Sequence, residues 1–357
     1  MEKDKRNGTI ELLRFLFCMA VLFFHISKDI YGEDWRPAEW GWGGGYCAME
    51  HWGVEFFFIT SGYFMANSVS KLQSDPQSLV KETWTYAWKK LKPILPYHVI
   101  FNLTAFFIGI VRGHTFEEHI NRLSCLFFLP AVGFNDLQWM LGAEWYVGCM
   151  LFGMLIIYPF LRRWTDQFIG YFAPVLTIIL YGYMSYNCEA VMGSNRLIQT
   201  FGTLMLGITV FSLSQYIGCL FDRINSGWLR RILRIYPLLV ITFFLAYMNT
   251  SIDTNVQAFL VLLLASGLVF SFGKQGLLSR SGVFDKKVVY WLGKMSLPIY
   301  MVQNITRTFV QVLFKNQTAV TMYILESAMT IVCGILGYYL LDALRVLKRK
   351  AKHDIVQ

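Results

Sequence analysis

The sequence predicts an all-α, polytopic membrane protein, a bundle of about ten transmembrane helices with both chain ends in the cytoplasm. The 357 residues are 55% hydrophobic and only 15% charged, whereas soluble domains average about 25% charged residues. Apolar runs of roughly the 20 residues that a bilayer span needs recur from one end of the chain to the other. Basic residues gather in short clusters between these runs, which is typical of cytoplasmic loops.

Ten spans are expected, each long enough to cross the hydrocarbon core. They cover residues 9–27, 52–69, 94–112, 139–161, 168–187, 197–217, 233–250, 256–273, 288–313 and 318–343. The first span lacks a small-residue cleavage site and contains charged residues, so we expect a retained helix and not a signal peptide. Residues 1–357 are therefore expected to form one membrane domain, without an appended extracytoplasmic domain.

The distribution of basic residues orients the bundle. With both chain ends in the cytoplasm, 25 of the 32 Lys and Arg residues fall on the inner side, as the positive-inside rule requires. These clusters also explain the net charge of +9, because they face anionic membrane lipids. Nucleic acid is therefore not an expected partner, and the expected location is the plasma membrane.

The first span carries two ionisable residues on one face. Arg14 and His25 are eleven residues apart, which on a helix is about three turns plus 20°, or roughly 16 Å along the axis. Glu11 lies three residues before Arg14 and can pair with it. Such groups in a membrane helix indicate a polar cavity and a functional site. The spacing alone also allows a snorkelling Arg14 and an interfacial His25.

Five segments carry a resemblance to a known family. They are Glu11-x2-Arg14-x10-His25; Gly53-Val54-Glu55-Phe56-Phe57 with Ser61-Gly62-Tyr63; Lys89-Lys90-Leu91-Lys92-Pro93 with Pro96-Tyr97; Glu144-Trp145-Tyr146 with Tyr158-Pro159; and 292–300, which ends at Tyr300. In this order they resemble the acyltransferase type 3 family of integral membrane proteins and cover nearly the whole chain. Two positions depart from its pattern, because Pro93 replaces a basic residue and Gln303 replaces a late histidine.

The resemblance implies a membrane-bound O-acyltransferase, most simply an O-acetyltransferase. It would move an acyl group from cytoplasmic acyl-CoA, usually acetyl-CoA, to a hydroxyl of a cell-surface or exported glycan, a lipid-linked saccharide or a related envelope molecule. The family histidine matches His25, which would act as general base on the acceptor hydroxyl or as a transient acyl carrier. No metal is expected to take part.

Other site residues follow from the same match. Arg14, Lys90 and Lys92 lie at the inner edge, where they would meet the phosphates of CoA; for the lysines, positive-inside topology is an equal explanation. Glu55 enters the second span near the depth of His25 and would orient the imidazole, or would be an interfacial carboxylate. The aromatic positions of the motifs, Trp145, Tyr146 and Tyr300, are expected to bind substrate. Ser61 and Gly62 are expected to allow close helix packing.

The alternative class is a membrane transporter or flippase for a polysaccharide precursor or a small anionic solute. Ten helices and internal charges suit that class, but the sequence lacks the two matching, Gly/Pro-interrupted halves that transporters often show. A scaffold without activity would explain neither Arg14 nor His25. The outer loop at 28–51 is acidic and rich in Trp; such a loop suits a sugar or an interfacial anchor.

Overall fold

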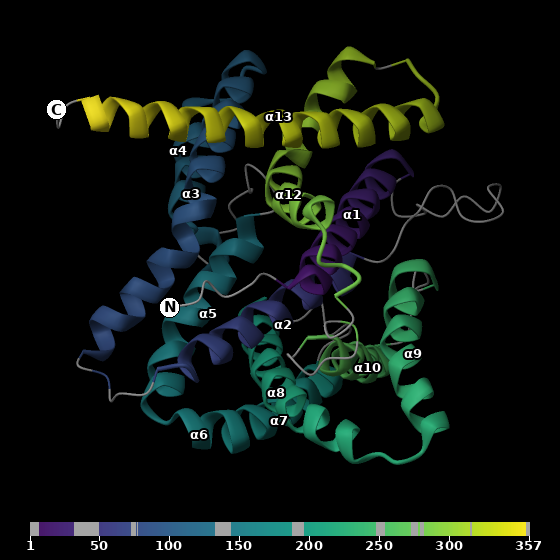
Figure 1. Ribbon diagram of the computed structural model, residues 1–357. Helices are drawn as coiled ribbons and strands as arrows, with labels where there is room; N and C mark the ends of the chain where they lie inside the picture. Colours follow the sequence, from purple (N-terminus) through teal and green to yellow (C-terminus); the bar gives the residue numbers. More distant parts are fainter. Residues whose placement is uncertain are drawn as a thin grey trace.

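The computed structural model describes residues 7–31, 50–72, 76, 78–132, 144–187, 196–247, 254–272, 278, 282–314 and 316–354. In these ranges every regular element is a helix and there is no strand, which confirms the all-α class (Figure 1). Most of the helices assemble into one bundle whose interior is filled by large apolar side chains.

The long helices follow the expected spans in chain order. They are α1 (Gly8–Tyr31), α2 (Glu50–Val69), α3 (Leu79–Val111), α5 (Glu144–Arg163), α7 (Ala173–Asn187), α8 (Arg196–Arg223), α9 (Gly227–Thr242), α10 (Thr254–Ser271), α12 (Lys287–Leu313) and α13 (Ala319–Asp354). Shorter elements connect or extend them. These are α4 (Phe116–Leu123), the 3-10 turns Ser124–Phe127 and Leu129–Val132, α6 (Thr165–Gln167), and the π turns Phe168–Phe172 and Phe243–Tyr247.

Within the described residues, six helical segments are long and apolar enough to cross a membrane, so the protein is a multi-pass membrane protein. They lie at Gly8–Ile30, Leu79–Val111, Trp145–Arg163, Thr165–Asn187, Arg196–Arg223 and Ala319–Leu347. The remaining four expected spans fall on α2, α9, α10 and α12, and their passage through the membrane stays a prediction.

Helix α3 begins earlier than the sequence predicts. We expected a span from residue 94, but the helix starts at Leu79, where the Ser78 side chain accepts a hydrogen bond from the Lys81 backbone N–H (3.3 Å). Thr83 and Tyr86 are buried against the bundle. Tertiary packing therefore stabilises the polar first half of α3, which the hydropathy pattern does not predict as part of a span. The basic segment 89–92 therefore lies on a helix and not in a loop.

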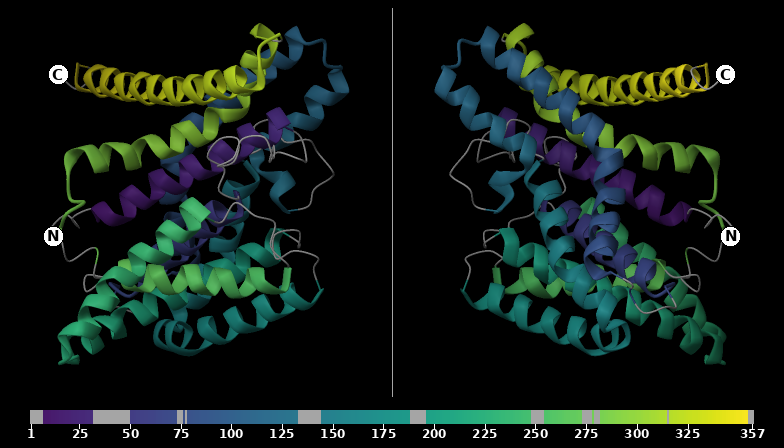
Figure 2. Two further views of the ribbon diagram at one scale, coloured as in Figure 1. Left: turned by 90° about the vertical axis from the view of Figure 1, so that its right-hand side faces the viewer. Right: turned by 90° about the vertical axis from the view of Figure 1, so that its left-hand side faces the viewer.

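The bundle has two groups of helices with α2 between them. Helices α1, α12 and α13 pack together on one side, while α8 packs with α7 and α10 on the other. Helix α2 contacts both α1 and α8, and its contact with α8 is the most extensive among the described helices. Figure 2 shows that α1 begins and α13 ends on the same side of the bundle. This is the arrangement that two chain ends in the cytoplasm require.

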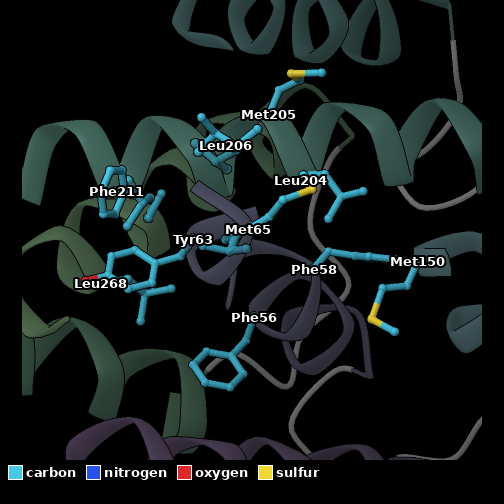
Figure 3. Packing of buried hydrophobic residues seen from close by; sticks show 14 of the residues in the cluster. Phe56, Phe58, Tyr63, Met65, Met150, Leu204, Met205, Leu206, Phe211 and Leu268 are labelled. Carbon is cyan, nitrogen blue, oxygen red and sulfur yellow. The ribbon is translucent and has the colours of Figure 1, made fainter. Parts of the chain in front are cut away.

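Glycines bring α2 and α8 into backbone contact. A Cβ atom on Gly62 would collide with the carbonyl oxygen of Leu204, and one on Gly207 would collide with the carbonyl oxygen of Ile59. Around this crossing, large side chains of the two helices interdigitate, including Phe58 on α2 (Figure 3). Small residues at the contact between membrane helices permit such an approach, which is the role that the sequence suggests for Gly62.

Candidate functional site

A basic cavity of about 660 Å³ lies between α1, α2, α3, α5, α12 and α13. Its volume falls in the range of small-molecule and cofactor sites, about 300–1,000 Å³. Five cationic side chains line it: Arg14 on α1, Lys89 and Lys90 on α3, Lys294 on α12 and Arg345 on α13. None of the described residues that line the cavity is acidic. The arrangement therefore favours an anionic ligand with several charges.

An ion pair with Glu11 holds the Arg14 side chain at the cavity. Its Nη1 atom lies 3.5 Å from Oε2 of Glu11, one turn earlier on α1, which confirms the pair that the sequence predicts. Glu11 packs against Gly293 of α12, where any Cβ atom would collide with its carboxylate. The Arg14 side chain is 34% exposed, so part of the guanidinium is available to a ligand.

The lysines of α3 divide between two environments. Lys90 is partly buried, with Nζ 5.2 Å from the centroid of the Tyr86 ring and 5.8 Å from that of the Phe64 ring. These cation–π contacts hold its ammonium at the cavity wall. Lys92 is exposed and does not belong to the cavity lining. Lys90 lines the cavity and Lys92 does not, and the role of both lysines in donor binding stays a prediction.

Three aromatic rings close round the cavity at α2, α5 and α12. The ring centroids of Phe57 and Tyr146 are 6.0 Å apart, those of Phe57 and Tyr300 are 6.4 Å apart, and those of Tyr146 and Tyr300 are 6.3 Å apart. Tyr146 and Tyr300, both expected to bind substrate, therefore meet at one place. The neighbouring Trp145 does not line the cavity, because it packs on Phe58 (6.3 Å) and under the Arg196 guanidinium (5.2 Å).

Helices α1 and α12 run parallel in a constant register. The Cys18 thiol donates a hydrogen bond to the Ser296 carbonyl oxygen (3.1 Å), across a separation of 278 residues. Further along both helices, Nη2 of Arg307 lies 2.7 Å from Oδ1 of Asp29, across the same separation. The two helices therefore stay level with each other over this stretch.

This register places His25 just beyond the cavity. Tyr300 is level with residue 22 of α1, three residues or about 4.5 Å along the axis before His25. Helix α1 is unbroken from Gly8 to Tyr31, so Arg14 and His25 lie on one face, about 16 Å apart along the axis. The partly buried His25 does not line the cavity itself. Along the axis of α1, His25 therefore lies beyond the level of Tyr300 as counted from Arg14.

Glu55 lies in a different polar network, facing α7 and α8. Its carboxylate is fully buried and accepts hydrogen bonds from Tyr181 Oη (2.8 Å), Thr203 Oγ1 (2.7 Å) and Gln199 Nε2 (3.0 Å). Three donors are what a buried carboxylate needs to offset its desolvation. These contacts fasten α2 to α7 and α8, while the expectation that Glu55 orients His25 stays a prediction.

Sequence reasoning missed part of the cavity. Lys294 and Arg345 line the cavity. In the sequence they are two of many basic residues on the expected inner side, and they indicate only the orientation of the helices. The one signal for Lys294 is its position within the motif at 292–300. Arg345 carries no signal, since only the fold brings the end of α13 beside α3. The donors around Glu55 also belong to no motif.

Comparison with protein families decides the class. A family model described as an acyltransferase domain matches residues 7–341, nearly the whole chain. The chain belongs to the acyltransferase type 3 family. The resemblance in the five sequence segments is thereby confirmed, and family membership implies a membrane acyltransferase with an acyl donor and an acceptor. No curated protein and no solved structure matches this acyltransferase.

Proposed function

We propose that this acyltransferase moves an acetyl group from cytoplasmic acetyl-CoA to a hydroxyl of a glycan or lipid-linked saccharide of the cell envelope. The basic cavity is the observation that carries this proposal. Its five cations match the phosphates of CoA, and its aromatic end suits the uncharged acyl arm. Acyl-CoA would enter from the side on which α1 begins and α13 ends, which positive-inside topology assigns to the cytoplasm.

The transfer step uses His25 as general base. Its imidazole takes the proton of the acceptor hydroxyl as the hydroxyl oxygen attacks the thioester carbonyl carbon. A C–O bond forms, the C–S bond breaks, and the proton passes from the imidazolium to the departing thiolate. The products are the O-acetylated acceptor and free CoA. Arg14 and Lys90 bind the donor phosphates, while Tyr146 and Tyr300 guide the acyl arm toward His25.

The remaining residues have supporting roles in this proposal. Glu55 fixes α2, which carries Phe57 of the aromatic end, and so helps to position the site. Trp145 lies next to Tyr146 and holds the start of α5 through its contact with Arg196. Residues 1–357 would work as one membrane domain in the plasma membrane, where both a cytoplasmic donor and an outer glycan are within reach.

Arg14→Lys is expected to raise the KM for acetyl-CoA about ten- to a hundredfold and to leave the half-saturating acceptor concentration unchanged. Lysine keeps the charge but lacks the planar guanidinium that binds a phosphate through two hydrogen bonds. Loss of one such charge-assisted contact costs about 1.5–3 kcal/mol. Initial rates of labelled acetyl transfer in membranes with matched protein levels measure the effect.

Arg231→Lys is the matched control for this substitution. Arg231 is an exposed basic residue on α9 and does not line the cavity, so its replacement should leave the KM for acetyl-CoA at the wild-type value. A wild-type KM in Arg14→Lys as well would show that Arg14 only snorkels to the membrane surface.

A further inference from the structure

A second polar cluster lies between α1, α12 and α13, on the far side of His25 from Arg14. It consists of Asp29 on α1, Gln303 and Arg307 on α12, and Glu326 on α13, and we call it the outer polar cluster. Asp29 and Arg307 form an ion pair at 2.7 Å, and Glu326 interacts electrostatically with both. None of these side chains belongs to the basic cavity.

The register of α1 and α12 places Gln303 level with His25. A separation of 278 residues joins Cys18 to Ser296 and Asp29 to Arg307, and the same separation joins His25 to Gln303. The cluster therefore begins level with His25 and continues toward the end of the bundle opposite to the basic cavity.

Two buried acceptor atoms in this cluster have no hydrogen-bond donor among the described residues. Gln303 is 4% exposed and Glu326 is 2% exposed, yet Oε1 of Gln303 and Oε2 of Glu326 make no hydrogen bond within the part of the chain that the structure describes. The hydroxyls of Ser27 on α1 and Ser327 on α13 are likewise buried and have no partner among the described residues. A buried polar atom left without a partner is costly, so the cluster is suited to a ligand that supplies hydroxyl groups.

Polar side chains one turn away show that α12 and α13 can satisfy their own groups. The hydroxyls of Thr306 and Thr330 lie 2.6 Å apart, and Thr306 Oγ1 also lies 2.9 Å from the Gln303 carbonyl oxygen. This pair braces the two helices where a structural hydrogen bond is needed. Gln303 and Glu326 each lie about one helical turn from this pair, and their unpaired acceptor atoms do not serve as such a brace.

The charges of the cluster indicate the kind of ligand. It contains two carboxyl groups and one guanidinium, so it offers no excess of positive charge to a phosphate, in contrast to the basic cavity. Its carboxyl and amide oxygens can accept hydrogen bonds from the hydroxyl groups of a ligand, and the Arg307 guanidinium can donate hydrogen bonds to the oxygens of those hydroxyl groups. The Arg307 side chain is 39% exposed, which places an edge of the cluster at the surface of the bundle.

We propose that the outer polar cluster is the subsite that binds the hydroxyl groups of a saccharide acceptor and presents one of them to His25. This inference rests on the proposed function and adds the place of the acceptor to it. Donor and acceptor then approach His25 from opposite ends of α1. Gln303 and Glu326 accept hydrogen bonds from the sugar, and the Asp29–Arg307 pair binds it at the rim.

The test compares Gln303→Met and Glu326→Leu with the wild-type protein in membranes. The donor is labelled acetyl-CoA, and the acceptor probe is the neutral glycan fraction of the producing cells' envelope, dosed by its hexose content. We expect the half-saturating glycan concentration to rise about tenfold in each variant, with the half-saturating acetyl-CoA concentration unchanged. Because each change removes an unpaired buried polar atom, the thermal midpoint of the detergent-solubilised protein should stay equal or rise.

Thr330→Val is the matched control on α13. It breaks the paired Thr306–Thr330 contact, so it should lower the thermal midpoint and leave the half-saturating glycan concentration unchanged. A half-saturating glycan concentration equal to that of the wild type in both Gln303→Met and Glu326→Leu would overturn the proposed subsite. The proposal would also be overturned if both variants had a lowered thermal midpoint and raised half-saturating concentrations of both acetyl-CoA and glycan. That result would show that the cluster only braces the helices. If the wild-type protein itself transferred no acetyl group, the proposed function would fall, and the subsite with it.

Discussion

His25→Ala is expected to lower acetyl transfer by about 10²–10⁴-fold, the usual contribution of a general base. Without the imidazole, no group at this depth of α1 takes the proton from the acceptor hydroxyl. The KM for acetyl-CoA should change little, because Arg14, the proposed donor-binding residue on the same helix, lies about 16 Å away along the axis. Rates of labelled acetyl transfer, normalised to the amount of protein in the membrane, measure the effect.

His114→Ala is the control for this substitution. It removes an imidazole from the turn between α3 and α4, far along the chain from α1 and outside the basic cavity. We expect transfer at the wild-type rate in this variant. Full activity in His25→Ala would remove His25 from the mechanism, whatever the control showed.

Gly207→Leu should prevent the stable packing of the bundle. A Cβ atom at this position would overlap the carbonyl oxygen of Ile59, and neither backbone can move without disturbing the contact between α2 and α8. Overpacking in a core costs about 1–3 kcal/mol, and more where backbone atoms must move. We expect the folded fraction after detergent extraction to fall severely, as measured by size-exclusion chromatography and by the thermal midpoint.

Gly182→Leu is the matched control for the crossing. Gly182 lies on α7, and no atom of the described residues stands within 4 Å of the position that its Cβ would take. The same substitution should therefore leave the folded fraction near the wild-type value. Equal folded fractions in Gly207→Leu and the wild type would show that the two helices do not cross as closely as described.

The helical fold could be predicted because it depends on properties that act locally along the chain. Apolar runs of membrane length determine where the long helices form, whereas the cytoplasmic side that the basic clusters indicate stays a prediction. The start of α3 could not be predicted in this way. Its first half is polar and is stabilised by tertiary packing of Thr83 and Tyr86 against the bundle, and a hydropathy pattern contains no such information.

The site could be predicted only where one helix or one motif carries it. Arg14 and His25 share a helix, so their common face follows from the helical period alone. Tyr146 and Tyr300 come from motifs of the family, and the fold confirms only that they meet. Arg345 joins the cavity through tertiary packing, which leaves no local pattern. The hydrogen-bond partners of Glu55 could not be predicted for the same reason.

Acetyl transfer in sealed membrane vesicles of known orientation tests the central claim most directly. Arg14, Lys90 and Arg345 line the basic cavity, in which we propose that the donor binds, on the side that positive-inside topology assigns to the cytoplasm. We therefore expect the protein to transfer the label from acetyl-CoA that is added to inside-out vesicles, and not from acetyl-CoA that is added to right-side-out vesicles. The label should appear on the glycan with wild-type protein and be lost with His25→Ala. Equal use of acetyl-CoA from both sides, or transfer that does not require His25, would contradict the claim.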